Sequence, residues 1–175
     1  MSFEMLLPEG VELEHLLLEL RKLSWIATDV LKAYARGEHP PYDFPKVLTV
    51  QDGGDGPVST ADMAINTLFV SGLEEKFPLV KWDILSEESA KGTTSKNIEI
   101  TEDWQWILDP LDGTKDFLQG SENYAVHIAL AYKQKPKIGI VLIPERNELW
   151  FGIIGKGAWY ENREGQKKQI SFSDR

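Results

Sequence analysis

Two aspartates three residues apart, Asp109 and Asp112, lie in the stretch Asp-Pro-Leu-Asp-Gly-Thr. A residue before proline favours an extended backbone, so Asp109 is expected at the end of a buried strand formed by residues 104–108. Gly113 permits a left-handed turn or a close approach to the backbone. A helix is expected to begin after it, with Asp112 as its N-cap. The spacing therefore predicts two carboxylates on one tight turn.

The start of that helix suits an anion. The amides of Gly113, Thr114 and Lys115 are expected to point outward, and free amides at a helix N-terminus bind phosphate. Carboxylates beside a phosphate repel it unless a cation lies between them, and Mg²⁺ is held by a few carboxylates plus substrate phosphate. The same six residues also suit an ordinary β-turn, because Asp, Pro and Gly are common turn formers. On their own they leave both interpretations open.

Two further acidic positions lie upstream. Ser59 precedes a helix expected over residues 60–76, and Asp62 three positions later resembles the second half of a capping box. Taken alone, Asp62 is better explained as a cap than as a catalytic group. Glu87 and Glu88 follow a buried strand expected over residues 79–85, and such acidic pairs are usually just solvated.

These motifs together resemble a known family. The stretch from Asp109 to Thr114 is similar to the signature of the Mg²⁺-dependent, lithium-sensitive phosphatases typified by inositol monophosphatase. The continuation Lys115-Asp116-Phe117 resembles the branch that hydrolyses 3'-phosphoadenosine 5'-phosphate, the 3'(2'),5'-bisphosphate nucleotidases. The resemblance runs from about Val58 to Tyr160. Lys115 is the main feature favouring this branch over the inositol or sugar phosphatases, which stay open as the alternative.

The resemblance assigns roles to individual residues. It implies that the metal is bound by three side chains and one backbone carbonyl, those of Glu87, Asp109, Asp112 and Leu111. Asp62 and Thr114 would orient and deprotonate the attacking water, and the amides of Gly113 and Thr114 would hold the phosphate. Glu88 is expected just behind the metal ligands. Thr114 alone is a poor base, so it needs Asp62 within hydrogen-bonding reach.

The expected donors are all oxygen atoms. Four carboxylates brought together repel and shift each other's pKa unless cations neutralise them. An oxygen-only set points to Mg²⁺ rather than zinc. Two or three such ions could polarise a phosphate ester and generate hydroxide for in-line attack, without a protein nucleophile.

Composition limits the classes of protein and partner. With 175 residues, 42% of them hydrophobic and 27% charged, the chain suits one globular domain. The formal net charge of −9, without a basic cluster, argues against binding of duplex nucleic acid. The absence of cysteine is compatible with a cytoplasmic location, and no apolar run approaches the length needed to span a membrane. The expected partner is therefore a small phosphorylated substrate.

Hydrophobic periodicity supplies the expected elements. Residues 11–36 predict a long amphipathic helix whose apolar stripe faces the core. Strands are expected over residues 47–51, 123–133, 137–143, 148–154 and 158–161, the last four as an antiparallel meander, with residues 162–175 as an end or linker. His127 is expected to be a packed side chain rather than a ligand. With the family resemblance, this predicts an α+β fold of helices packed on a largely antiparallel sheet.

The resemblance covers only the first part of the family's pattern. Residues 1–175 are expected to form a single N-terminal phosphatase domain. Family members continue into a second α/β region with a Trp-Asp-x-Ala pattern that completes the second metal site, and this pattern is missing after Tyr160. The chain is then a fragment or a naturally short member, with weak metal binding and low turnover, and a possible homodimer. A non-catalytic binding or assembly module is the alternative of another class.

Overall fold

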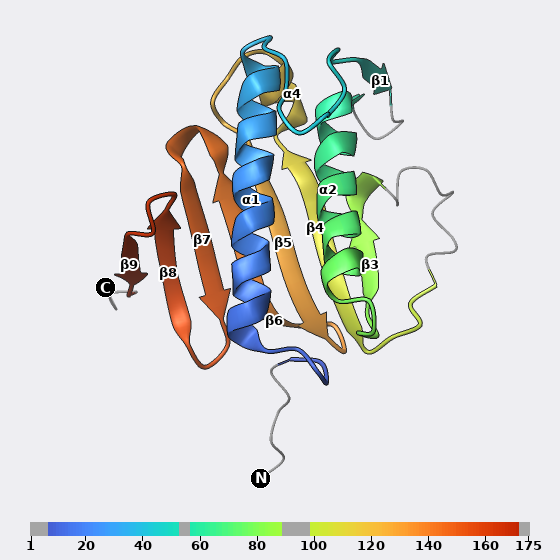
Figure 1. Ribbon diagram of the computed structural model, residues 1–175, viewed down its shortest axis with the longest axis vertical. Coiled ribbons are helices and arrows are strands. Elements are labelled where there is room, and N and C mark those ends of the chain that lie inside the picture. The colour runs from blue at the N-terminus through green and yellow to red at the C-terminus, as the bar shows by residue number, and fades with distance from the viewer. Residues whose placement is uncertain (1–6, 53–56, 89–98, 172–175) are drawn as a thin grey trace.

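The computed structural model describes residues 7–52, 57–88 and 99–171, in which two long helices lie side by side on one face of a sheet (Figure 1). The helical segments are α1 (Leu13–Ala35), α2 (Thr60–Lys76), the short α4 (Thr114–Leu118) and the 3-10 turn η1 (Pro144–Arg146). The strands are β1 (Val50–Asp52), β2 (Pro57–Ser59), β3 (Asp83–Ser86), β4 (Trp104–Asp112), β5 (Ala125–Tyr132), β6 (Lys135–Ile143), β7 (Glu148–Ile153), β8 (Gly157–Asn162) and β9 (Lys167–Ile170).

The main sheet has seven strands in the order β3-β4-β5-β6-β7-β8-β9. The β3–β4 pair is parallel and every other pair is antiparallel. The expected α+β class, with helices on a largely antiparallel sheet, is confirmed, and so is the meander. The expectation of an end or linker over residues 162–175 is wrong, because residues 167–170 form β9. This strand pairs with β8 through its backbone while its side chains stay largely exposed, so it carries no apolar pattern.

The core lies between the helices and one face of the sheet. Along α1, the stripe that includes Leu16, Leu20 and Ala27 is fully buried, as its spacing predicts. Trp106 is also fully buried on β4, whereas its neighbour Ile107 is 49% exposed. Successive side chains of a strand point to opposite faces, so Ile107 lies on the face that α1 and α2 leave uncovered.

Three predicted elements differ in extent. The strand expected over residues 79–85 is only Asp83–Ser86, because the chain turns after Pro78 and Leu79 is 92% exposed. The strand expected over residues 47–51 begins at Val50 and pairs with β2 in a hairpin. Residues 53–56, which connect these two strands and which the glycines predict to be a turn, lie outside the described residues. β4 does not end before Asp109 but runs to Asp112, with a shift in its pairing to β5 between these two positions.

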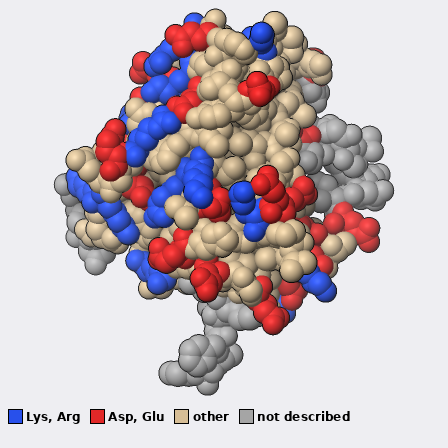
Figure 2. Space-filling view, viewed as in Figure 1, with Lys and Arg blue, Asp and Glu red and all other residues tan. Residues whose placement is uncertain are grey.

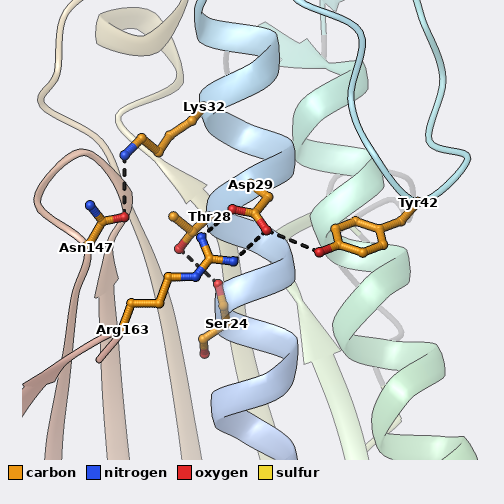
Figure 3. Close-up of polar contacts among 7 residues, drawn as sticks. All are labelled: Ser24, Thr28, Asp29, Lys32, Tyr42, Asn147 and Arg163. Atoms are coloured by element: carbon orange, nitrogen blue, oxygen red, sulfur yellow. Dashed lines mark hydrogen bonds and ion pairs between the residues drawn. The ribbon is translucent and has the colours of Figure 1, made fainter. Parts of the chain in front are cut away.

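Polar contacts attach α1 to two turns of the main sheet, one between β6 and β7 and one between β8 and β9. Arg163, in the turn between β8 and β9, donates two hydrogen bonds to the carboxylate of Asp29, which also accepts one from Tyr42 (Figure 3). Lys32 reaches the side chain of Asn147 at 3.4 Å. The contacts of Arg163 and Asn147 join the helix to segments more than a hundred residues away in sequence.

The helix-bearing side of the molecule carries both signs of charge. Lysine and arginine side chains alternate there with aspartate and glutamate (Figure 2).

In the part of the chain that the structure describes, no helix is long and apolar enough to cross a membrane.

Candidate metal and phosphate site

The parallel pairing of β3 and β4 brings Glu87 to Asp109. Ser86 is the partner of Leu108 in this pair, so Glu87, which follows β3, comes next to Asp109, which continues β4. Burial raises the pKa of Asp109 to about 7, and the neighbouring carboxylates of Glu87 and Asp112 add to this rise. The amide of Leu111 donates to Asp109 Oδ1 at 3.2 Å and acts in the opposite direction. Three carboxylates from two strands therefore share one small region.

Gly113 makes the turn after these carboxylates possible. Its φ is 84°, and a Cβ at this position would lie 2.7 Å from the backbone oxygen of Asn123. Gly113 is the N-cap of α4, so the expectation that Asp112 caps this helix is wrong. Asp112 instead completes β4, and its side chain is 58% exposed. The helix therefore begins one residue later than the sequence pattern suggested.

The amides at the start of α4 are left without helical partners. The first hydrogen bond within this helix runs from Phe117 N to Gly113 O at 2.9 Å. The amides of Gly113, Thr114 and Lys115 precede it and therefore have no partner within the helix.

Asp62 joins the N-terminus of α2 to this turn. Thr114 Oγ1 lies 3.0 Å from Asp62 Oδ1 and 2.9 Å from the carbonyl oxygen of Leu111. Asp62 Oδ2 accepts from Ser59 N at 2.7 Å and from the Ser59 hydroxyl, and the complete capping box is present. Asp62 is 1% exposed. It is thus both the helix cap that the sequence suggested and a contact of Thr114, two roles that its two oxygens can fill together.

Glu88 lies away from solvent beside this group. It is 9% exposed, and its amide donates to the Ser86 hydroxyl at 3.3 Å. Glu87 is exposed by contrast. The two acids of the pair therefore have different surroundings, which their sequence alone did not show.

The surroundings of His127 differ from those expected from the sequence. It was expected to be a packed side chain, but its side chain is 45% exposed and Nε2 lies 3.9 Å from Asp112 Oδ2. The alternation along β5 placed it correctly on the face shared by Ala125 and Ala129, opposite the buried residues. The missing information was the register, which sets Asp109 directly across from His127.

The donors fit a hard divalent cation in chemistry. The carboxylates are crowded enough to raise the pKa of Asp109, and a cation among them would relieve their repulsion. As they are placed, no three acidic, histidine or cysteine side chains in the described residues form a group that could hold an ion.

Comparison with known proteins identifies the family. Residues 12–175 match the inositol monophosphatase family. The chain belongs to this family. The protein named 3'(2'),5'-bisphosphate nucleotidase CysQ from Escherichia coli K12 is 38% identical over 136 residues, which cover 76% of this chain and 52% of that protein. Inositol monophosphatase 3 from Solanum lycopersicum is 36% identical over 106 residues, covering 61% and 38% of the two chains.

Solved structures show the same fold. The extragenic suppressor protein suhB from Bartonella henselae is 26% identical with a TM-score of 0.65, over 85% of this chain and 52% of that one. The Thermotoga maritima IMPase has the same TM-score at 24% identity, over 93% and 54%, a likeness that concerns the fold alone. The chain thus spans about half the length of the relatives it matches.

Proposed function

We propose that the chain contributes the metal- and phosphate-binding part of a Mg²⁺-dependent phosphomonoesterase site, in a protein that acts as a 3'(2'),5'-bisphosphate nucleotidase. The observation that carries this is the grouping of Glu87, Asp109 and Asp112 beside the Thr114–Asp62 pair. Residues from a strand end, a turn and a helix N-terminus meet there although they are separated by up to 52 positions in sequence. A structural turn alone does not require this concentration of acidic groups.

In the proposed site, Glu87, Asp109, Asp112 and the Leu111 carbonyl hold Mg²⁺. When bound, the metal supplies polarisation of the phosphate ester and a water of lowered pKa. The proposal takes two or three such ions, the number that the family resemblance implies.

The proton of the attacking water follows the Thr114–Asp62 hydrogen bond. Ser59 donates to Asp62 Oδ2 through both its amide and its hydroxyl, which leaves Oδ1 directed at Thr114. Thr114 Oγ1 accepts the proton of the water as it passes its own proton to Asp62 Oδ1. The new O–P bond forms while the ester O–P bond breaks, and the leaving alkoxide takes a proton from solvent.

The amides of Gly113 and Thr114 hold the phosphate in the proposed complex. They precede the first hydrogen bond within α4, and amides at a helix N-terminus favour an anion. Glu88, buried behind Glu87, would hold the polypeptide at this corner in place. The cation cancels the repulsion between phosphate and carboxylates.

The bisphosphate nucleotide is the preferred substrate on two grounds. The CysQ relatives match a larger share of the chain than the inositol monophosphatases from tomato do. Lys115 is exposed directly after the phosphate-binding amides, where a cation can meet the second phosphate of such a nucleotide. Inositol monophosphates, which carry no second phosphate for Lys115 to meet, are the second candidate.

Phosphate release tests the proposal. We would compare adenosine 3',5'-bisphosphate with inositol 1-phosphate, with and without Mg²⁺, for this chain alone and for this chain joined to the part of the E. coli relative beyond the match. We expect Mg²⁺-dependent, lithium-inhibited release from the nucleotide by the joined protein, and little by the chain alone. Asp109→Asn should lower it at least a hundredfold, whereas the exposed Asp116→Asn should change it less than threefold.

The outcomes separate the alternatives. Faster release from inositol 1-phosphate would reassign the substrate and keep the phosphatase. No release from either substrate, with metal binding unchanged in Asp109→Asn, would overturn the phosphatase proposal in favour of a non-catalytic module.

A further inference from the structure

We propose that Tyr124 is a positioning residue for the phosphate-binding turn, residues 112–114, and that it acts through the hydrogen bond from its hydroxyl to Glu145. This turn carries the Gly113 and Thr114 amides of the proposed phosphate site. The inference rests on the proposed function, and it concerns what holds these amides in place rather than what they bind.

The backbone of Tyr124 lies directly against the phosphate-binding turn. A Cβ added at Gly113 would lie 2.7 Å from the backbone oxygen of Asn123 and 3.5 Å from the Cα atom of Tyr124. Glycine thus lets the two segments meet backbone to backbone. Because protein interiors are close-packed, a shift of residues 123–124 changes the position of the turn.

The Tyr124 ring makes a second contact with the same region, at α4. The ring of Phe117 meets it edge to face, with centroids 4.9 Å apart and planes at 83°. The two residues are 3% and 4% exposed, so both rings are enclosed in the core. The amide of Phe117 donates to the Gly113 oxygen at 2.9 Å and closes the first turn of α4. Tyr124 therefore contacts both the phosphate-binding turn and the helix that follows it.

The Tyr124 hydroxyl is attached to a different part of the molecule. It donates to Glu145 Oε1 at 2.5 Å. Glu145 belongs to η1, between β6 and β7, and its other oxygen lies 3.9 Å from Nη2 of Arg36, at the C-terminal end of α1. This end of α1 lies at the same end of the sheet as α4 (Figure 1). Tyr124 thus connects the phosphate-binding turn to α1 and to the β6–β7 connection.

The chemistry of this hydrogen bond suits a fixed position. Burial raises the pKa of the Tyr124 hydroxyl, and the hydrogen bond to Glu145 adds to the rise, so the hydroxyl stays a donor near neutral pH. The Glu145 side chain is only 15% exposed. Hydrogen bonds to carboxylates are shorter and stronger than those between neutral groups. Loss of the hydroxyl should therefore loosen the turn although the ring stays in place.

Amide hydrogen exchange of the whole chain tests the positioning role. Tyr124→Phe removes the hydroxyl and keeps the ring against Phe117. The matched control is Tyr34→Phe, because Tyr34 is also 4% exposed and its hydroxyl donates to the Pro45 oxygen at 2.6 Å. We expect the Phe117 amide to exchange about fivefold faster in Tyr124→Phe than in Tyr34→Phe, as the loss of one hydrogen bond implies. Amides of α2 should respond alike in the two variants.

Binding of inorganic phosphate measures the consequence for the site. We would determine dissociation constants of phosphate, with Mg²⁺ present, and of Mg²⁺ alone by calorimetry. Phosphate affinity should fall about fivefold in Tyr124→Phe, while Mg²⁺ affinity changes less than about twofold. Tyr34→Phe should bind both as the wild type does.

Variants of Glu145 separate the hydrogen bond from general packing. Glu145→Gln keeps an oxygen that can accept from the Tyr124 hydroxyl, so phosphate affinity should stay within about twofold of the wild type. Glu145→Leu removes the acceptor and should lower phosphate affinity as Tyr124→Phe does. In Tyr124→Phe, the further change Glu145→Leu should then have little additional effect.

The outcomes distinguish this inference from the proposed function. Equal exchange at Phe117 in the two tyrosine variants would overturn the positioning role, as would phosphate affinity unchanged in Tyr124→Phe or lowered equally in Tyr34→Phe. A wild type that binds Mg²⁺ but no phosphate would instead overturn the phosphate site of the proposed function. The exchange at Phe117 would still decide whether the Tyr124 hydroxyl holds the turn.

Discussion

The Asp109 side chain lies where a negative charge is unfavourable. It is half buried, adjacent to Glu87 across the parallel pair and near Asp112 in the turn, and all three factors raise its pKa, to about 7. A carboxyl whose pKa is higher in the folded than in the unfolded state binds more protons when folded. The metal-free fold therefore loses stability as the pH rises from about 4 to about 7.

The variant Asp109→Asn tests this charge directly. At pH 8 in EDTA, its free energy of unfolding should exceed that of the wild type by about 1–2 kcal/mol. The full pKa difference corresponds to roughly 4 kcal/mol, and solvent screening of a half-buried group reduces it. At pH 4, where the folded wild-type carboxyl is protonated and the unfolded one is only partly ionised, most of this difference should be gone. Urea unfolding at both pH values gives this comparison.

Added Mg²⁺ should reverse the order of the two proteins. The wild type gains stability from the ion that its carboxylates bind, and the variant gains less. The exposed Asp116→Asn serves as the control and should follow the wild type at both pH values and with Mg²⁺. If Asp109→Asn is less stable than the wild type at pH 8 in EDTA, the carboxylate is not under repulsion.

Residue types and spacing identified most of the candidate site. The turn from Asp109 to Thr114 was visible because aspartate, proline and glycine together determine a narrow set of backbone conformations. Asp62 and Glu87 were placed by family resemblance, since a cap and a solvated pair explain their sequence equally well. His127 was missed because its neighbours depend on the pairing register of two strands, which side-chain alternation within one strand does not contain.

At the scale of elements, the connection from β4 to α4 depends on Gly113. The residue combines φ of 84° with a Cβ direction that is blocked at 2.7 Å by the backbone oxygen of Asn123. Gly120, beyond the end of α4, has φ of 77° with no atom within 4 Å of its Cβ direction. Both glycines therefore have a positive φ that other residues disfavour, but only at Gly113 does a neighbouring atom block a Cβ.

Alanine at each glycine separates these two contributions. Gly120→Ala should cost about 1–2 kcal/mol of folding free energy, the cost of a left-handed non-glycine residue. Gly113→Ala should cost about 1–3 kcal/mol more, because the backbone at Asn123, just before β5, or that of the turn must also move. Chemical denaturation of the two variants measures both values. Equal losses would show that the approach to Asn123 is not tight.

The long elements were predictable and the short ones were not. α1 has a sustained apolar stripe, the start of α2 is marked by its capping box, and β5 to β8 alternate over six or more residues, so one-dimensional patterns suffice. β9 has four residues, largely exposed, and is formed through backbone pairing with β8. The stretch at residues 79–82 is apolar but has no strand partner in the structure, because Pro78 turns the chain before β3 begins.

At the scale of the molecule, the far edge of the sheet is held by contacts outside the core. The turn between β8 and β9 reaches α1 through Arg163 and Asp29, 134 positions apart in sequence, with Arg163 Nη2 at 2.7 Å from Asp29 Oδ2. The hydrogen bonds from Arg163 lower the pKa of Asp29. A lowered carboxyl pKa stabilises the fold above its ordinary value near 4, and this contribution is lost as the pH falls through the folded value.

A double-mutant cycle of Asp29→Asn and Arg163→Gln measures how strongly this edge is attached. The side chains are 26% and 41% exposed and paired through two hydrogen bonds, so we expect a coupling of about 1 kcal/mol at pH 7 that disappears near pH 2. Asp103 and Lys133, 3.4 Å apart and both 59% exposed, are the matched surface pair, with an expected coupling below about 0.5 kcal/mol.

Because β9 has only β8 as a neighbour in the sheet, its amides should also exchange with solvent faster in Arg163→Gln, while those of β4 and β5 stay protected. Equal coupling in the two pairs, or unchanged exchange in β9, would mean that the backbone pairing alone holds this edge.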